Sequence, residues 1–223
     1  MKMEDRPQTA FRLLLFVQHF FLLSSFVLAS CASPTPSIPT ESITGYATDS
    51  AQPWMSELFA CANEQNILVE VTAENPDISL RIGESGNFVS PSFQIDEEEV
   101  LVVVNRESSI QNLTLEEVQA LFAGQGDKSV QVWVYASGLD LQMVFDQFVM
   151  KSRSVTSFAR LASSPQEMSD VLGSESEAIG FLPKRWVTGN IREVYSVGIF
   201  PILAITQNEP QGTVSQLIGC LQK

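Results

Sequence analysis

Histidine and cysteine are scarce in this sequence, and their scarcity excludes several kinds of chemistry. The 223-residue chain has one histidine, His19, and three cysteines. His19 lies in an N-terminal segment that we expect to be removed, so the mature chain has no histidine for a Ser-His-Asp site, a Cys-His site or a metal site. We therefore expect a protein that is not an enzyme and carries neither a metal nor a cofactor.

Basic residues are also few. The chain has 13 Lys and Arg against 26 Asp and Glu, which gives a formal net charge of −13. Nucleic-acid binding needs clustered Lys and Arg, so we expect no nucleic-acid partner. A small anionic ligand is compatible with this charge, because backbone N–H groups and hydroxyls can hold it in a buried site. Hydrophobic residues make up 44% of the chain, which is enough for a packed core.

The first 30 residues have the pattern of a secretory signal peptide. Three basic residues within the first twelve precede two apolar runs, at 13–16 and 20–28. A charged segment followed by an apolar one is typical of such a signal. An uncleaved membrane anchor is the alternative, which Gln18 and His19 disfavour because they interrupt the apolar run that a spanning helix needs.

The end of this segment, Leu28-Ala29-Ser30-Cys31, resembles a bacterial lipobox. The resemblance implies cleavage before Cys31, a lipid on that cysteine, and a mature protein held on the extracytoplasmic side of a bacterial cell membrane. Residues 31–42 are rich in Pro, Ser and Thr and cannot form a core. We therefore expect them to be a linker between the lipid and the folded domain.

Two cysteines remain after lipidation of Cys31. In an oxidising compartment Cys61 and Cys220 could pair and so tie an early helix to the last one. Two unpaired core cysteines are the alternative. The spacing of the two residues in the sequence does not decide between these possibilities.

Apolar periodicity and turn signals predict alternating strands and helices from residue 43 onward. The helices are expected at 51–61, 114–123, 139–149, 164–173 and 214–221, and the strands at 67–72, 77–82, 99–105, 130–135, 178–182, 191–197 and 200–206. Capping-box patterns begin at Thr114 and Ser164, and the acidic run at 96–99 is expected to be solvated. The alternation predicts an α/β fold with mainly parallel sheets, whose ligands bind beyond the carboxyl ends of strands.

Two turns carry hydroxyl groups beside predicted helix starts. Thr48, Asp49 and Ser50 precede the first helix, and Ser137 and Gly138 lie where a strand leads into the third. The first N–H groups of a helix have no intrahelical partner and lie at the positive end of its dipole, so each turn is a candidate anion site. Ser137 could instead be an ordinary N-cap.

Several segments together resemble one family. EVLVVVN followed by NLTLEEVQALFAG, then VWVYASGLDLQMVFDQFV, EAIGFL and FPILAITQNEPQGTVSQLIGCL are similar in order and spacing to the phosphate-binding branch of the type 2 periplasmic binding proteins, the solute-binding lipoproteins of ABC importers. The resemblance implies an α/β, two-lobed fold. Lobe 1 would comprise residues 43–104 and 198–223, and lobe 2 residues 105–197, with hinges near Val104 and Gly198.

The resemblance also implies a set of ligand-binding residues, which are Thr48, Asp49, Ser50, Arg81, Ser137 and Gly138. The chain is shorter than the family pattern, because a Ser-Gly-Ser-Gly turn is missing after the strand at 67–72. Leu139 and Asp140 stand where the family has a threonine and an arginine. A carboxylate at position 140 would repel a bound dianion.

Two functions are compatible with these observations. The first is a lipid-anchored extracytoplasmic protein that binds a small phosphate-like oxyanion or polar solute between its lobes for an ABC importer, with the permease as its partner. The alternative is a degenerate binding-protein-like module with an interaction or structural role in the envelope and no ligand. The missing turn and Asp140 favour the alternative. The two functions are distinguished by whether the turns at Ser50 and Ser137 face one cleft and whether Asp140 points into it.

Overall fold

The computed structural model describes residues 41–83 and 90–223, which belong to a single structural unit. The predicted signal peptide, Cys31 and the linker up to residue 40 lie outside the described residues. None of the helices within the described ranges is both long enough and apolar enough to cross a membrane.

Most of the strands and helices that the apolar periodicity predicts are present, and two further strands, at Glu41–Ala47 and Arg160–Ala162, were not predicted. The strands are β1 (Glu41–Ala47), β2 (Ile67–Val71), β3 (Ile78–Ile82), β4 (Ser92–Asn105), β5 (Gln131–Tyr135), β6 (Arg160–Ala162), β7 (Ala178–Pro183) and β8 (Ile191–Ile205). The α-helices are α2 (Met55–Glu64), α3 (Leu115–Phe122), α4 (Asp140–Phe145), α5 (Pro165–Ser174) and α6 (Gly212–Leu221). The shorter helices are η1 (Asp49–Trp54) and η3 (Lys184–Trp186), which are 3₁₀-helical, and η2 (Asp146–Met150), which is π-helical.

The strands form one eight-stranded sheet in the order β2-β1-β3-β8-β4-β7-β5-β6. Neighbouring strands are parallel at both ends of the sheet, in β2-β1-β3 and β7-β5-β6. They are antiparallel in the centre, in β3-β8-β4-β7. The predicted α/β class with mainly parallel pairing is confirmed. The antiparallel pairing at the centre of the sheet was not predicted.

The two parallel groups point toward each other. Through β8, Ile82 at the carboxyl end of β3 is level with Asp96 of β4, and Pro183 at the carboxyl end of β7 pairs with Val100 of the same strand. β3 runs parallel to β4 and β7 runs antiparallel to it, so the carboxyl ends of the two groups approach one stretch of β4 from opposite directions. Ligands of α/β folds bind beyond such ends, and the candidate site lies here.

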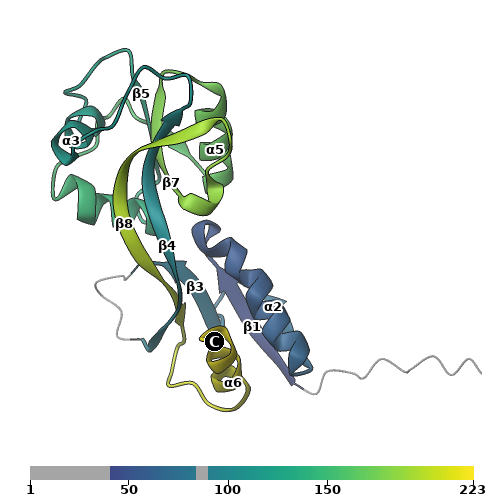
Figure 1. Ribbon diagram of the computed structural model, residues 1–223. Coiled ribbons are helices and arrows are strands. Elements are labelled where there is room, and N and C mark those ends of the chain that lie inside the picture. Colours follow the sequence, from purple (N-terminus) through teal and green to yellow (C-terminus); the bar gives the residue numbers. More distant parts are fainter. Residues whose placement is uncertain (1–40, 84–89) are drawn as a thin grey trace, which may run out of the picture. The chain divides into compact units, whose positions relative to one another are not determined.

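β4 and β8 are the long strands of the sheet and lie side by side (Figure 1). Their pairing extends from Ser92 opposite Ile205 to Asn105 opposite Ile191, with register shifts along the way. The two strands predicted at 191–197 and 200–206 are therefore one strand, and β4 begins well before the predicted residue 99. Gly198, with φ of 144°, allows β8 to continue through a bend at which the sequence pattern breaks.

The prediction of a solvated acidic run at 96–99 is wrong for Glu98, whose side chain is only 5% exposed. Arg185 donates to the carboxylates of Glu98 (2.8 Å) and Asp96 (3.1 Å), and Lys184 lies 2.7 Å from Glu99. Because η3 follows β7 directly, its two cations reach the neighbouring strand β4. Burial of Glu98 is compatible with its charge because Arg185 pairs with it.

Aromatic side chains hold the elements around the candidate site. Phe145 of α4 stacks on Phe181 of β7 with ring centroids 4.1 Å apart, and Phe122 of α3 lies 4.6 Å from Phe145. Trp54 at the end of η1 is fully buried and donates its indole N–H to Asp96 over 2.8 Å. The guanidinium of Arg185 lies 4.0 Å from the centre of the Trp54 ring. α4 and η1 are thus packed firmly on either side of the site.

The helix predicted at 139–149 is shorter than expected. The α-helix ends at Phe145, and η2 continues with a π-helical bond from Lys151 N–H to the Asp146 carbonyl. A π turn is wider than an α turn, so it moves later side chains off the original face. Val149 is still buried, but Phe148, predicted in the apolar stripe, is 45% exposed.

The two predicted capping boxes have different outcomes. At α3 the box is complete, because Thr114 Oγ1 accepts from Glu117 N–H and the Glu117 carboxylate accepts from Thr114 N–H. At α5, Ser164 accepts from Glu167 N–H as an N-cap, but the Glu167 carboxylate accepts from Ser163 instead of from Ser164. The N-cap at α5 is present and the reciprocal half of the box is displaced by one residue.

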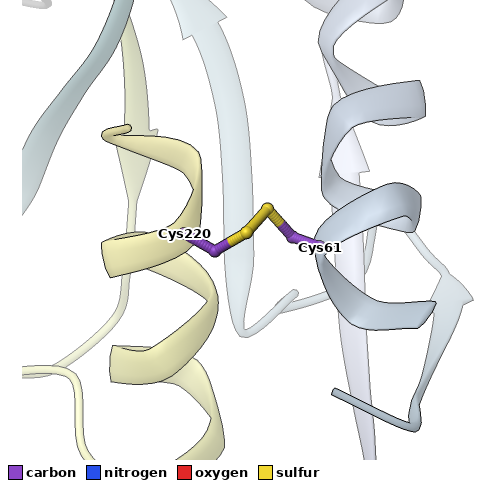
Figure 2. The surroundings of a disulfide bond; sticks show 2 residues. All are labelled: Cys61 and Cys220. Carbon is purple, nitrogen blue, oxygen red and sulfur yellow. A yellow bond between two sulfur atoms is a disulfide. The ribbon is translucent and has the colours of Figure 1, made fainter. Parts of the chain in front are cut away.

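Cys61 of α2 and Cys220 of α6 form a disulfide (Figure 2). Their Cα atoms are 5.9 Å apart, and the bond closes a sequence separation of 159 residues. The helices that bear them lie at the two ends of the described chain. Of the two possibilities that the sequence left open for these cysteines, the structure has the paired one.

Candidate functional site

The site is organised around the carboxylate of Asp140, the first residue of α4, which is 4% exposed. Its Oδ2 atom accepts hydrogen bonds from Thr48 Oγ1 (2.7 Å), Ser50 Oγ (2.5 Å) and the Ile82 N–H (3.0 Å). Its Oδ1 atom accepts from the N–H of Leu141 (2.9 Å). We call the three donors to Oδ2, namely Thr48 Oγ1, Ser50 Oγ and Ile82 N–H, the Asp140 cradle.

Strand ends place the donors of the cradle. Thr48 directly follows β1, Ser50 lies in η1, and Ile82 ends β3, which pairs with β1. The Thr48 N–H donates to the Leu80 carbonyl, which fixes the turn after β1 against β3. The Thr48 side chain does not cap η1, so its hydroxyl is available to Asp140, and it also lies 3.0 Å from Ser50 Oγ.

The chemistry of the cradle is that of an anion site. Two hydroxyls and a backbone N–H are donors of the kind that hold carboxylates and oxyanions, and such charge-assisted bonds are stronger than neutral ones. The arrangement therefore binds an anion, and the anion is the side chain of this chain's own Asp140.

Arg81 of β3 contributes positive charge near this carboxylate. Burial lowers the pKa of the Arg81 guanidinium, and the negative charge of Asp140 opposes that shift. Its Nη2 atom lies 3.9 Å from the sulfur of Met143 on α4. Arg81 is half-buried between β3 and α4, and its charge partly compensates that of Asp140.

The negative charge of Asp140 also reaches Tyr135 at the end of β5. The pKa of this phenol is raised well above its usual value, first by burial and then by Asp140. The Tyr135 hydroxyl donates to the Phe181 carbonyl over 3.1 Å. Tyr135 is therefore a neutral wall of the site and supplies no hydrogen bond to the carboxylate.

There is almost no free space beside the cradle. The cavity lined by Ser50, Tyr135 and Asp140 has a volume of ≈ 10 Å³, which is the lower limit for one water molecule. Gly83, with φ of 71°, directly follows β3 and lies close to α4. A Cβ at this position would lie 2.6 Å from the Val144 side chain of α4. A tetrahedral oxyanion does not fit between η1 and α4 in this arrangement.

The structure brings together only part of the predicted ligand-binding set. Thr48 and Ser50 are in the cradle, and Arg81 is close enough to interact electrostatically with Asp140. Asp49 is exposed and lines the small cavity beside them. Ser137 is exposed and lines a different cavity, of ≈ 460 Å³.

Gly138 is also exposed, with φ of 96° and open space where a Cβ would be. Neither Ser137 nor Gly138 lines the cavity beside the cradle.

Sequence reasoning missed two members of the site. Asp140 was identified as a departure from the family pattern but not as an occupant of the site, although an acid where the family has an arginine was the available signal. The backbone N–H of Ile82 carries no sequence signal. Among the residues that the structure describes, no cluster of His, Cys, Asp or Glu could hold a metal ion.

Solved structures similar to this chain identify its fold. An ABC-type phosphate transport receptor from Vibrio cholerae is 16% identical, with a TM-score of 0.65 over 81% of this chain and 93% of that one. A putative phosphate ABC transporter substrate-binding protein with bound phosphate, from Clostridium perfringens, is 12% identical, with a TM-score of 0.72 over 81% and 92%. The chain has the type 2 periplasmic-binding-protein fold. Both of these neighbours are phosphate-transport proteins, and at this identity the likeness shows the fold alone.

This binding-protein fold is also shared by a regulatory domain. The reduced form of the regulatory domain of OxyR2 from Vibrio vulnificus is 11% identical, with a TM-score of 0.60 over 81% of this chain and 94% of that one. No family model matches the sequence, and no curated protein matches it. The fold therefore has both solute-binding and regulatory examples, and the chemistry of the site has to distinguish between functions.

Proposed function

We propose that this chain is an extracytoplasmic module with a binding-protein fold that serves an interaction or structural role in the bacterial envelope and does not capture a free solute. The observation that carries this proposal is the position of the Asp140 carboxylate, which accepts from Thr48, Ser50 and Ile82 in the cradle. The donors that would hold a solute anion are already in use.

Electrostatics support the same conclusion. A second anion at the cradle would lie beside the negative charge of Asp140 in a buried environment, where like charges repel strongly. The cavity of ≈ 10 Å³ leaves no room for the two anions together. Binding of phosphate at the cradle would require the Asp140 carboxylate to leave its three donors there first.

A second candidate is capture of a small oxyanion or polar solute for an ABC importer, with the importer's permease as partner. Its support is the fold shared with two phosphate-transport proteins and the hydroxyls of Thr48 and Ser50 beside Arg81. In this candidate the incoming solute displaces the Asp140 side chain from the cradle.

The proposal includes the predicted tether. Cleavage after residue 30, a lipid on Cys31 and a linker would hold the module at the outer side of the membrane, and the linker ends by residue 40 because β1 begins at Glu41. The proposal also keeps the division into lobe 1 (43–104 and 198–223) and lobe 2 (105–197). In this division the cradle hydroxyls belong to lobe 1 and Asp140 belongs to lobe 2.

Calorimetry separates the two candidates. The mature protein, purified in detergent, is titrated with phosphate, sulfate and arsenate, and we expect no heat of binding because the Asp140 carboxylate holds the donors. Recovery of protein partners in a pull-down from membranes, without a bound solute, would agree with this outcome. Saturable heat with any of these oxyanions would reject the interaction module and favour solute capture.

A further inference from the structure

We propose that Asp140 acts as a built-in ligand, a side chain that takes the place of a solute anion and ties the ends of β1 and β3 to α4. The inference rests on the proposed function and adds a mechanism to it. The closed arrangement of these elements would then be permanent, because the chain supplies the anion that keeps it closed.

The first argument is the origin of the donors. A helix-capping aspartate accepts from N–H groups of its own helix. In Asp140 only Oδ1 accepts from its own helix, from the N–H of Leu141. All three donors to Oδ2 come from residues 58 to 92 positions away in the sequence. Most of its hydrogen bonds therefore connect separate elements and do not stabilise α4 alone.

The second argument is the cost of removing the carboxylate. Ser50 is 2% exposed and Ile82 is fully buried, so water does not replace a lost acceptor easily. The two hydroxyls of Thr48 and Ser50 can still bond to each other, but the Ile82 N–H would have no acceptor. A buried donor without an acceptor destabilises the folded state, so the cradle requires an anion or an equivalent acceptor.

The third argument is that positive charge is positioned for this anion. Arg81 lies on the same strand as Ile82, and the charge of Asp140 counteracts the effect of burial on the Arg81 pKa. If the Asp140 side chain were removed, the three cradle donors would lose their acceptor, and the half-buried Arg81 guanidinium would lose the negative charge beside it. They would then form a vacant anion site of the size of the lost group, which a small oxyanion from solution could enter.

The experiment compares the mature wild-type protein with Asp140→Ala by thermal unfolding, with and without millimolar phosphate or sulfate. We expect Asp140→Ala to lower Tm by roughly 2–12 °C, because the buried Ile82 N–H loses its acceptor. We expect phosphate or sulfate to restore part of this loss in the variant and to leave the wild-type Tm unchanged. The double variant Asp140→Ala, Ser50→Ala should lose most of the restoration.

Glu57→Ala is the matched control, because it removes one negative charge from an exposed position on α2. It should show neither the loss of Tm nor the response to phosphate. If Asp140→Ala is as stable as wild type and binds no oxyanion, Asp140 is not a built-in ligand. If the wild-type protein is itself stabilised by phosphate, the proposed function fails instead, so the two failures are distinguishable.

A second variant covers the case in which Asp140→Ala does not fold. Asp140→Asn keeps the shape of the side chain but removes its charge and one acceptor atom. We expect a smaller loss of Tm, faster hydrogen exchange at the Ile82 amide and no response to phosphate, because the amide still fills the cradle. Wild-type exchange at Ile82 together with wild-type Tm in this variant would overturn the proposal.

Discussion

A single charge at position 140 changes what the surrounding donors bind. The two hydroxyls and one N–H of the cradle would suit many small anions, and nothing in Thr48 or Ser50 selects among them. Asp140 presents a carboxylate to them at a fixed distance and without translational entropy to lose, which a free solute cannot match. At this scale, the identity of one residue separates a solute-binding site from a closed one.

A second residue-scale feature is the buried acid Glu98. Burial raises the pKa of Glu98 most strongly, and hydrogen bonding and charge from Arg185 lower it. Because the pKa in the folded state exceeds the unfolded value, Glu98 favours folding below the unfolded pKa, and this contribution is lost as pH rises through the folded pKa. Arg185 limits that loss, since it stabilises the ionised form.

We therefore expect Arg185→Gln to destabilise the protein by about 1–3 kcal/mol at neutral pH, and by less at acid pH where Glu98 is protonated. Denaturant unfolding at several pH values, from about 4 to about 8, measures the difference. Arg185 also contacts Asp96 and Trp54, so Glu98→Gln is used as the second background. A pH-dependent effect of Arg185→Gln that persists in that background would contradict the assignment to Glu98.

At the scale of single elements, the helix ends show which interactions are local. The α3 capping box satisfies backbone N–H groups with residues only three positions apart, and hydrogen bonds from Thr114 lower the pKa of Glu117. The π-helical turn of η2 is different, because no capping motif marks it in the sequence and it follows α4 without a break. Local motifs therefore predict where a helix begins better than where it changes its pitch.

The capping box gives a prediction at this scale. Thr114→Ala should cost about 0.5–2 kcal/mol of stability because it leaves Glu117 N–H without its acceptor, whereas Thr114→Ser keeps the hydroxyl and should be close to wild type. Chemical denaturation of the three proteins measures the order. Equal midpoints for the alanine and serine variants would show that the cap contributes nothing to stability.

At the scale of the whole molecule, the disulfide joins the beginning of the described chain to its end. α2 and α6 are 159 residues apart at their cysteines, so the bond restricts a large part of the unfolded chain. The long strands β4 and β8 form a second connection, because they lie between the two parallel groups of strands, β2-β1-β3 and β7-β5-β6 (Figure 1). Both connections bring segments together that are distant in the sequence.

Replacing both cysteines by serine, Cys61→Ser with Cys220→Ser, should lower the free energy of unfolding by about 2–5 kcal/mol. Unfolding in denaturant, compared with wild type before and after reduction, measures the loss. The reduced wild type should resemble the double variant, which serves as the internal control. An unchanged midpoint in both would mean that packing of α2 on α6 alone accounts for the stability of this region.

Short-range patterns along the chain were enough to predict the α/β class, most of the strands and helices, the α3 cap and the hydroxyl turn at Thr48 and Ser50, but not β1 or the short β6. These features depend on residues a few positions apart, because periodicity and caps act over one or two turns. The single strand β8 was predicted as two, since its bend at Gly198 resembles a break.

The closure of the site was decided by tertiary packing. Asp140 meets its donors only because the sheet order directs the carboxyl ends of β1 and β3 toward α4, across 58 to 92 residues of sequence. Burial of Glu98 likewise depends on the pairing of β7 with β4, because this pairing places Arg185 of η3 beside Glu98. Hydrogen bonds to a buried carboxylate require atoms to be within about 3 Å, and sequence spacing carries no information on distances between remote segments.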